Sequence, residues 1–218
     1  MTITRGDFAC KIDLASKRGF LETAPEIRSF DSFLRTVYSW LLIQNKGFLL
    51  HSAGAVINGK GYLFVGKSGA GKSTIARQVA SCKSPSYANR LRKGRQVTRY
   101  KILSDELMPL RIINGKAKIY PSMFWGEMGQ GIEARGERRE CSEGIILKKI
   151  FFLKKSKHNR ISKITKIEFY KKLLACVMNF SKEPGDAQKT LKTIDTLADK
   201  IQYFELEFTR HYPFNPAG

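Results

Sequence analysis

One eight-residue stretch limits the fold of this chain more than any other feature. It reads Gly66-Lys67-Ser68-Gly69-Ala70-Gly71-Lys72-Ser73, which matches the pattern GxxxxGK[ST] in full, and Thr74 follows it. Glycine allows backbone dihedrals that a side chain forbids, so successive N–H groups of such a loop can point inward at phosphate oxygens. The loop needs a strand before it and the N-terminus of a helix after it, because the helix dipole favours an anion there.

The flanking residues agree with that requirement. Residues 62–65 form an apolar run typical of a strand, and Ile75, Ala76 and Val79 recur at helical spacing after the loop. In such a site Lys72 reaches the β- and γ-phosphates of a nucleotide, and the Ser73 hydroxyl binds Mg²⁺. The sequence therefore predicts ATP and Mg²⁺ as ligands of residues 66–74. The alternative is a glycine-rich turn without a ligand.

Further elements follow from apolar periodicity and turn residues. We expect an edge strand at 7–14, an amphipathic helix at 30–44, a hairpin around Asn58-Gly59 whose loop Lys60 and Gly61 lengthen, a strand at 100–104, a hairpin around Asn114-Gly115 and a strand at 145–153. Together these elements predict an α/β fold in which a mixed β-sheet contains the phosphate loop and is flanked by helices. We expect a single domain over 1–218 with its core at 47–110.

The C-terminal part, 145–210, combines helices with a last strand. Thr165 and Glu168 have the spacing of a capping box, which opens a helix that we expect to extend to about Phe180. A second helix at 186–200 is expected to turn Leu191 and Ile194 inward, and 202–208 alternates as a strand.

Composition narrows the classes of protein. Lys and Arg number 39 against 19 Asp and Glu, a formal charge of +20, while 42% of the 218 residues are hydrophobic. That apolar content excludes disorder throughout, and the surplus charge must lie outside, where it attracts anions. Four cysteines without a CxxC pair fit a reduced, cytoplasmic setting, and no stretch has the apolar length of a membrane span or signal peptide.

Three side chains outside the loop are candidates for phosphate chemistry. Asp105 follows a predicted strand directly, with Glu106 beside it, so either carboxylate can hold a metal or take a proton. His51 lies fifteen residues before Gly66. An acid after a strand also occurs as a simple turn residue, and a lone histidine is often structural, so both alternatives stay open.

The stretch HSAGAVINGKGYLFVGKSGAGKST, together with LSDE, resembles the core of the HPr kinase/phosphorylase family. The fold of that family is distantly similar to the nucleotide-binding part of ATP-dependent phosphoenolpyruvate carboxykinase. Short HPr-kinase-like proteins associated with peptide-modifying systems are the nearer comparison. The resemblance is firm over about residues 47 to 110 and suggestive beyond, through PSMFWGEM and IILKKIFFL.

The resemblance implies a serine kinase that transfers the γ-phosphoryl group of ATP to a hydroxyl of a peptide or protein. It implies that His51 lies near the transferred phosphate, that Lys72 and Ser73 contact phosphate and metal, and that Asp105 is the base. Ser73, Asp105 and Glu106 are then the metal ligands, and Glu127 is either a further ligand or a surface acid. The alternative is an ATP-binding switch or NTPase that binds an anionic partner without phosphorylating it.

Two basic runs bear on what kind of partner the chain binds. Residues 83–101, an insertion by comparison with the family, carry seven Lys or Arg and no acid, and 148–172 carry ten with one acid. Such runs are commonly solvated faces. We expect four residues of the insertion to recruit an acidic peptide or protein acceptor: Arg90, Arg92, Lys93 and Arg95. Nucleic acid is a weaker alternative because aromatic residues are sparse there, and a homo-oligomer stays open.

Overall fold

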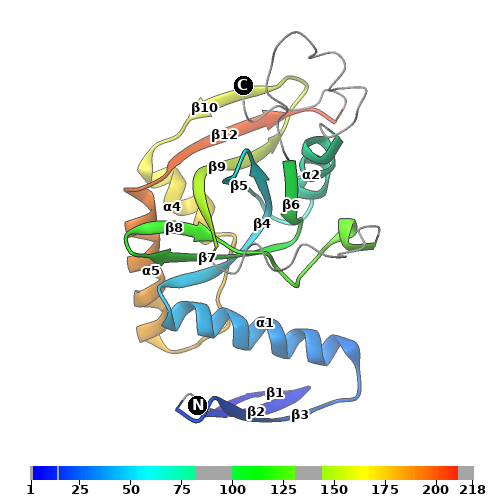
Figure 1. The fold of residues 1–218 in the computed structure, drawn as a ribbon, viewed down its shortest axis with the longest axis vertical. Coiled ribbons are helices and arrows are strands. Elements are labelled where there is room, and N and C mark those ends of the chain that lie inside the picture. The colour runs from blue at the N-terminus through cyan, green and yellow to red at the C-terminus, as the bar shows by residue number, and fades with distance from the viewer. Residues whose placement is uncertain (1, 14, 82–99, 131–143, 211–218) are drawn as a thin grey trace.

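The structure, a computed structural model, describes residues 2–13, 15–81, 100–130 and 144–210. These residues form a mixed α/β fold with a large mixed sheet, helices on both of its faces and a small N-terminal sheet (Figure 1). The α/β expectation and its mixed sheet are therefore confirmed.

The large sheet has nine strands in the described part of the chain, in the order β10-β12-β9-β5-β4-β7-β8, with β6 and β11 also paired to β4. Three neighbours, β5, β9 and β12, are parallel, and the pairs around β4 are antiparallel. The strand bounds are β4 (Gly47–Ile57), β5 (Lys60–Val65), β6 (Tyr100–Ser104), β7 (Leu107–Ile113), β8 (Lys116–Ile119), β9 (Ile145–Lys155), β10 (Arg160–Lys163), β11 (Val177–Met178) and β12 (Gln202–Phe208).

Helices cover both faces of this sheet. They are α1 (Ile27–Gln44), α2 (Lys72–Ser81), α4 (Lys166–Leu174) and α5 (Pro184–Ala198), with a short 3₁₀ helix η1 (Glu127–Gln130). Successive side chains of a strand point to opposite faces, so Phe64 packs with α2 while Leu63 packs with α4 and α5. Burial on both faces explains why residues 62–65 of β5 are an unbroken apolar run.

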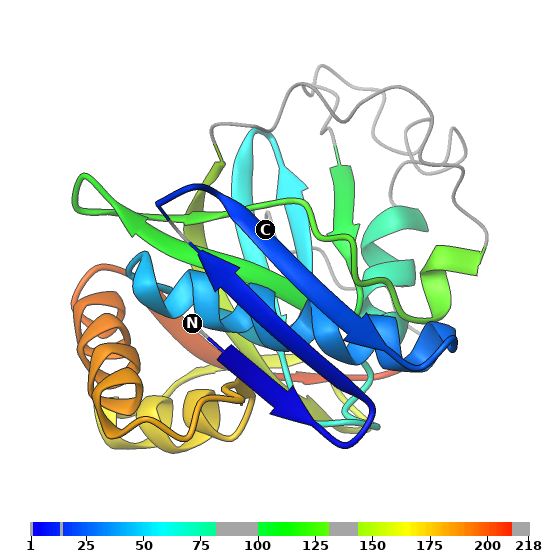
Figure 2. The same cartoon turned by 90° about the horizontal axis from the view of Figure 1, so that it is seen from below.

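The small sheet consists of β1 (Thr2–Arg5), β2 (Phe8–Asp13) and β3 (Arg18–Thr23), in that order. Figures 1 and 2 show α1 between this sheet and the large one, and Phe8 packs edge-on against Phe33 of α1. The strand predicted at 7–14 exists, but as the central strand. The edge assignment was wrong because β1 and β3 are short and mostly exposed, which leaves no apolar alternation to read.

Both predicted hairpins form, and the first is tighter than expected. Ile57 pairs directly with Lys60, so the loop is only Asn58-Gly59, and both residues have positive φ, 50° and 77°. Two left-handed residues in succession match the right-handed twist of the flanking strands in a two-residue turn. Lys60 therefore belongs to β5 and does not lengthen the loop.

Helix limits differ from prediction where tertiary contacts decide them. The capping box at Thr165 is present, with the Thr165 N–H donating to the Glu168 carboxylate over 2.8 Å. Its helix, α4, ends at Leu174, because the chain then pairs with β4 as β11. Leu191 of α5 was expected inward but is 47% exposed, and β10 was not predicted.

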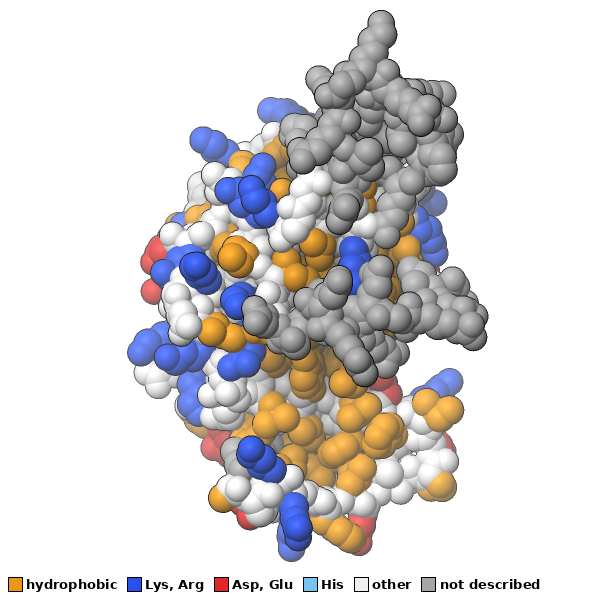
Figure 3. All heavy atoms as spheres, viewed as in Figure 1, with side chains coloured by type: hydrophobic (Ala, Val, Ile, Leu, Met, Phe, Trp, Pro, Cys, Tyr) orange, Lys and Arg blue, Asp and Glu red, His pale blue; other side chains and the backbone are white. Residues whose placement is uncertain are grey.

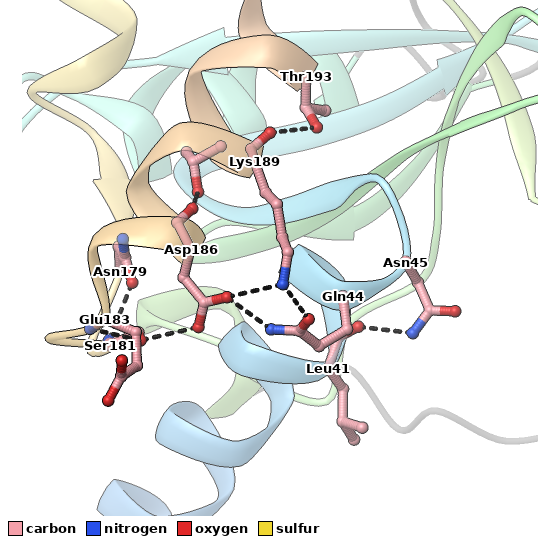
Figure 4. Close-up of polar contacts among 10 residues, drawn as sticks. Leu41, Gln44, Asn45, Asn179, Ser181, Glu183, Asp186, Lys189 and Thr193 are labelled. Carbon is pink, nitrogen blue, oxygen red and sulfur yellow. Dashed lines mark hydrogen bonds and ion pairs between the residues drawn. The ribbon is translucent and has the colours of Figure 1, made fainter.

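A polar cluster joins α5 to the end of α1 (Figure 4). Asp186, 4% exposed, accepts hydrogen bonds from Gln44 Nε2 and Ser181 Oγ, both at 2.8 Å, and from Lys189 Nζ at 3.1 Å. Burial raises the pKa of this carboxyl, but the three donors together outweigh burial, so the pKa lies below its ordinary value. The cluster therefore fixes two helices through one ionised acid.

Within the described ranges, no helix combines the length and apolar character needed to cross a bilayer. Figure 3 shows apolar side chains gathered over α1 and the small sheet, and Lys and Arg side chains over the part where β10 and β12 lie.

Candidate functional site

The ends of the parallel strands bring the candidate residues together. Because β5, β9 and β12 are parallel, their carboxyl ends meet at one edge of the sheet, where α/β proteins commonly bind ligands. The glycine loop (residues 66–71) follows β5 at this edge, Lys155 ends β9, and Arg210 follows β12. β6 runs in the same direction, since it and β5 are both antiparallel to β4, and it ends just before Asp105.

The glycine loop has left-handed backbone dihedrals, and the side chain of Lys72 binds its carbonyl groups. Gly69 and Gly71 have φ of +76° and +98°. Lys72, 8% exposed, donates from Nζ to the carbonyl oxygens of Gly66 at 3.1 Å and Lys67 at 3.2 Å. Burial lowers the pKa of Lys72, opposed by nearby acids. Among the described residues, the Lys72 ammonium therefore has only these two carbonyl oxygens as hydrogen-bond acceptors.

Asp105 and Glu106 interrupt one long strand. β6 and β7 both pair with β4 on the same side, and the two acids lie between them, opposite the centre of β4. The Ser104 hydroxyl fixes this interruption because it accepts the Glu106 N–H at 3.0 Å and donates to the Phe124 carbonyl at 2.6 Å. Interruptions of this kind re-aim side chains beside functional sites.

The two acids have different partners. Asp105, 2% exposed, accepts the N–H of Gly126 at 2.8 Å on one carboxylate oxygen and that of Met128 at 3.2 Å on the other. Glu106 accepts from Arg35 of α1 at 3.0 Å. Each oxygen of Asp105 keeps a second lone pair for a further hydrogen bond.

His51 lies on β4 at the point where β5 ends, since the next residue along β4 pairs with the last residue of β5. The backbone N–H of His51 donates to the Cys176 carbonyl at 2.8 Å. Burial lowers the pKa of His51, and the Lys72 ammonium lowers it further against the opposing effect of Glu106, so the neutral imidazole is favoured at pH 7.

A cavity of about 360 Å³ joins these residues. Its lining includes the predicted residues His51, Ser68, Gly69, Gly71, Lys72, Ser73, Thr74, Asp105 and Glu106, as well as Gly126, Glu127, Lys155 and Arg210. Gly66, Lys67 and Ala70 are not in the lining, and the Ala70 N–H donates within the loop to Lys67. A hollow of about 430 Å³ on the small sheet is more open and contains no glycine loop, so the first cavity is the candidate functional site.

Sequence reasoning missed three lining residues as site residues: Gly126, Lys155 and Arg210. Lys155 belongs to the basic run 148–172, which was read as a face rather than a site. A Cβ at Gly126 would lie 3.1 Å from the Asp105 carboxylate, which is closer than ordinary van der Waals contact, so a side chain there would push against this acid. Glu127, left open above, lines the cavity and pairs with Arg77 of α2 at 2.7 Å.

The cavity contains potential metal ligands, but the described side chains alone do not make a complete metal site. In the described part of the chain, no three His, Cys, Asp or Glu side chains cluster closely enough to hold an ion. The Ser73 hydroxyl and the carboxylates of Asp105 and Glu106 do share the cavity. Such a set fits Mg²⁺, which is usually bound by one or two carboxylates together with substrate phosphates and water.

Most of the basic insertion lies outside the described residues, including Arg90, Arg92, Lys93 and Arg95, so its predicted role stays a prediction. No model of a protein family matches the sequence, and no curated protein matches it either.

Proposed function

We propose that the chain is an ATP-dependent kinase that transfers the γ-phosphoryl group to a hydroxyl, most simply serine, of a peptide or protein. The main support is one convergence: the glycine loop, His51 and Asp105 line the same cavity at the carboxyl ends of parallel strands. In this proposal residues 66–74 are a P-loop within an HPr-kinase-like core, as the sequence resemblance implies.

Lys72 is the phosphate-binding cation in this mechanism. Its two present acceptors are neutral carbonyls, and exchange of one for a phosphate oxygen gives a stronger, charge-assisted hydrogen bond. Burial strengthens that interaction, because the dielectric constant around the ammonium is lower than in water. The loop N–H groups that line the cavity and the N-terminus of α2 add to the same field.

Asp105 accepts the proton of the acceptor hydroxyl. The N–H groups of Gly126 and Met128 hold its carboxylate in one orientation, as a positioned base requires. His51, which is neutral, donates or accepts a hydrogen bond beside the transferred group. When bound, Mg²⁺ would be held by Ser73 and by Asp105 or Glu106, and it would neutralise charge on the phosphates.

A second candidate function follows from the burial of Asp105. A carboxylate that is 2% exposed and bound to two backbone amides can have a purely structural role, which is to fix residues 126–128. The chain would then be an ATP-dependent switch or NTPase that binds an anionic partner without phosphorylating it.

The test measures binding and transfer separately. Binding of an ATP analogue is followed by calorimetry, and transfer by intact mass after incubation with ATP, Mg²⁺ and serine-containing peptides encoded beside the gene. Lys72→Ala should abolish both, while Lys60→Ala, an equal charge loss on the exposed hairpin, should change neither. ATP binding without any phosphopeptide favours the switch, and absence of ATP binding in the unmodified protein contradicts both functions.

A further inference from the structure

The acids that line the cavity have protein partners, whereas two of the cations have none among the described residues. Each acid in the lining has a protein donor: Asp105 has two amides, Glu106 has Arg35, and Glu127 has Arg77. Lys155 and Arg210 also line the cavity, and neither side chain forms an ion pair or hydrogen bond with a described residue. This wall of the cavity therefore presents two cations that no described acid neutralises.

The position of these two cations follows from the sheet. Lys155 pairs in register with Phe208 of β12, and Arg210 lies two residues beyond that partner. The connection 156–159 closes over the same end, since Ser156 N–H donates to the Phe208 carbonyl at 3.0 Å and Asn159 accepts the Thr209 N–H at 2.9 Å. Lys157 of this connection is exposed and is not among the residues that line the cavity.

The neighbouring lysine provides a contrast. Lys154 is paired with Glu207 at 2.8 Å and with Glu205 at 3.6 Å, so the acids of β12 neutralise the face that carries Lys154. Lys155, next in sequence, points to the other side of β9 and has no such acid. The surplus charge at the cavity is therefore local and is not a general property of the sheet.

We propose that Lys155 and Arg210 form a subsite for the acidic side chains of the acceptor peptide, an inference that rests on the proposed kinase function. The basic residues continue to the exposed Lys157, which is not among the lining residues, so the cations extend beyond the cavity and fit an extended anionic chain better than a nucleotide held by the glycine loop. Peptide carboxylates are favoured over RNA because Tyr, Phe and Trp, which stack on bases, are absent from 154–160.

The geometry of the sheet gives the separation, along the acceptor peptide, between the phosphorylated serine and the acidic residues. Along the order β9-β5-β4-β6, Lys155 at the end of β9 is three strand spacings from Asp105, which follows β6, and Arg210, which follows β12, is four. At about 4.8 Å per spacing these separations are about 14 Å and about 19 Å. An extended chain covers about 3.3 Å per residue, so the acidic residues lie about four to six positions from the phosphorylated serine.

The experiment uses the full chain and labelled synthetic peptides. Each peptide has one serine and three glutamates placed four to six residues from it, on the N- or C-terminal side, and a matched peptide has glutamines instead. Fluorescence anisotropy gives their affinities without nucleotide and with an ATP analogue. We expect one glutamate peptide to bind about tenfold more tightly than its glutamine match, and Lys155→Gln/Arg210→Gln to remove that difference.

A charge-matched control variant and the affinity for the ATP analogue make the result specific. Lys192→Gln/Lys200→Gln loses the same charge on and after α5 and should keep the glutamate preference. ATP-analogue affinity should stay within twofold in this control variant. If Lys155→Gln/Arg210→Gln instead weakens the analogue and keeps the glutamate preference, the cations serve the nucleotide and the proposal is wrong.

The failure modes of the two proposals differ. Unmodified protein that does not bind the ATP analogue contradicts the kinase function, while the glutamate preference measured without nucleotide still tests the subsite. A single-stranded RNA oligonucleotide that binds more tightly than the glutamate peptide, and depends on the same two cations, would overturn the assignment to a peptide. Equal binding of glutamate and glutamine peptides to the unmodified protein would also overturn it.

Discussion

The Asp105→Asn variant separates a catalytic carboxylate from a structural one. Asparagine keeps the shape of the side chain but has one carbonyl oxygen where aspartate has two acceptors. One of the N–H groups of Gly126 and Met128 must then face an NH₂ group instead of an oxygen. The variant therefore loses a base and a backbone contact together.

The structural part of the loss can be estimated. A hydrogen bond to a charged group contributes about 1.5–3 kcal/mol, and a buried donor left without an acceptor costs about 1–3 kcal/mol. Because Asp105 is 2% exposed, water does not replace the lost acceptor. We expect the free energy of unfolding to fall by about 2–3 kcal/mol, which lowers Tm by about 5–10 °C for a chain of this size.

The catalytic part is measured on the folded variant. Transfer and ATP-analogue binding are assayed well below the lowered Tm, where removal of a general base should reduce kcat by about 10²–10⁴ while ATP affinity is kept. The matched control is Ser104→Ala, because that hydroxyl fixes the same interruption through Glu106 and Phe124 without being a base. It should lose stability and keep most of its transfer activity.

Two results would refute this reasoning. An unchanged Tm of Asp105→Asn would show that the two amide contacts do not stabilise the fold. If transfer by Asp105→Asn stays within threefold of the unmodified protein, or if Ser104→Ala loses as much activity as Asp105→Asn, Asp105 is a structural residue and the base lies elsewhere.

Two further predictions concern the loop and the helix cluster. Gly71→Ala should lose about 2–4 kcal/mol of stability and bind the ATP analogue weakly, because Gly71 has positive φ and a Cβ would lie 2.6 Å from the Phe208 ring. Gly69→Ala, with positive φ but open space, should lose about 1–2 kcal/mol, and equal losses in thermal denaturation would contradict the steric argument. Asp186 has a lowered folded-state pKa, so its contribution is present above the unfolded-state pKa of about 3.9 and is lost as pH falls through the folded value. Urea denaturation at pH 7 and pH 3 should show a smaller pH effect for Asp186→Asn, and an equal pH effect would disprove this role.

The features that sequence predicts correctly are those that a few neighbouring residues decide. Asn-Gly in two successive left-handed positions makes a hairpin wherever it occurs, and the capping box at Thr165 satisfies its own backbone donors. The strand, glycine loop and helix around Lys72 form for the same reason. Each of these signals is complete within about ten residues.

The features that sequence misses depend on which strands become neighbours. Lys155 and Arg210 are far apart in sequence, and only the parallel pairing of β9 with β12 brings them to one cavity wall. Likewise, α4 ends early because the following residues pair with β4. Leu191 has the right period for the core, but Ile194 and Leu197 fill the available space against the sheet.

The arrangement of charge along the sheet edge connects the two proposals. Arg210 and Lys155 stand on one side of the glycine loop, and His51 and Asp105 stand on the other, because the order of the strands fixes that sequence. Under the two proposals, a phosphoryl donor held by the loop would lie between the acceptor's hydroxyl and its acidic residues. The acids of the cavity already have donors, whereas these two cations have no acceptor among the described residues, so an anion from the acceptor would complete the charge balance there.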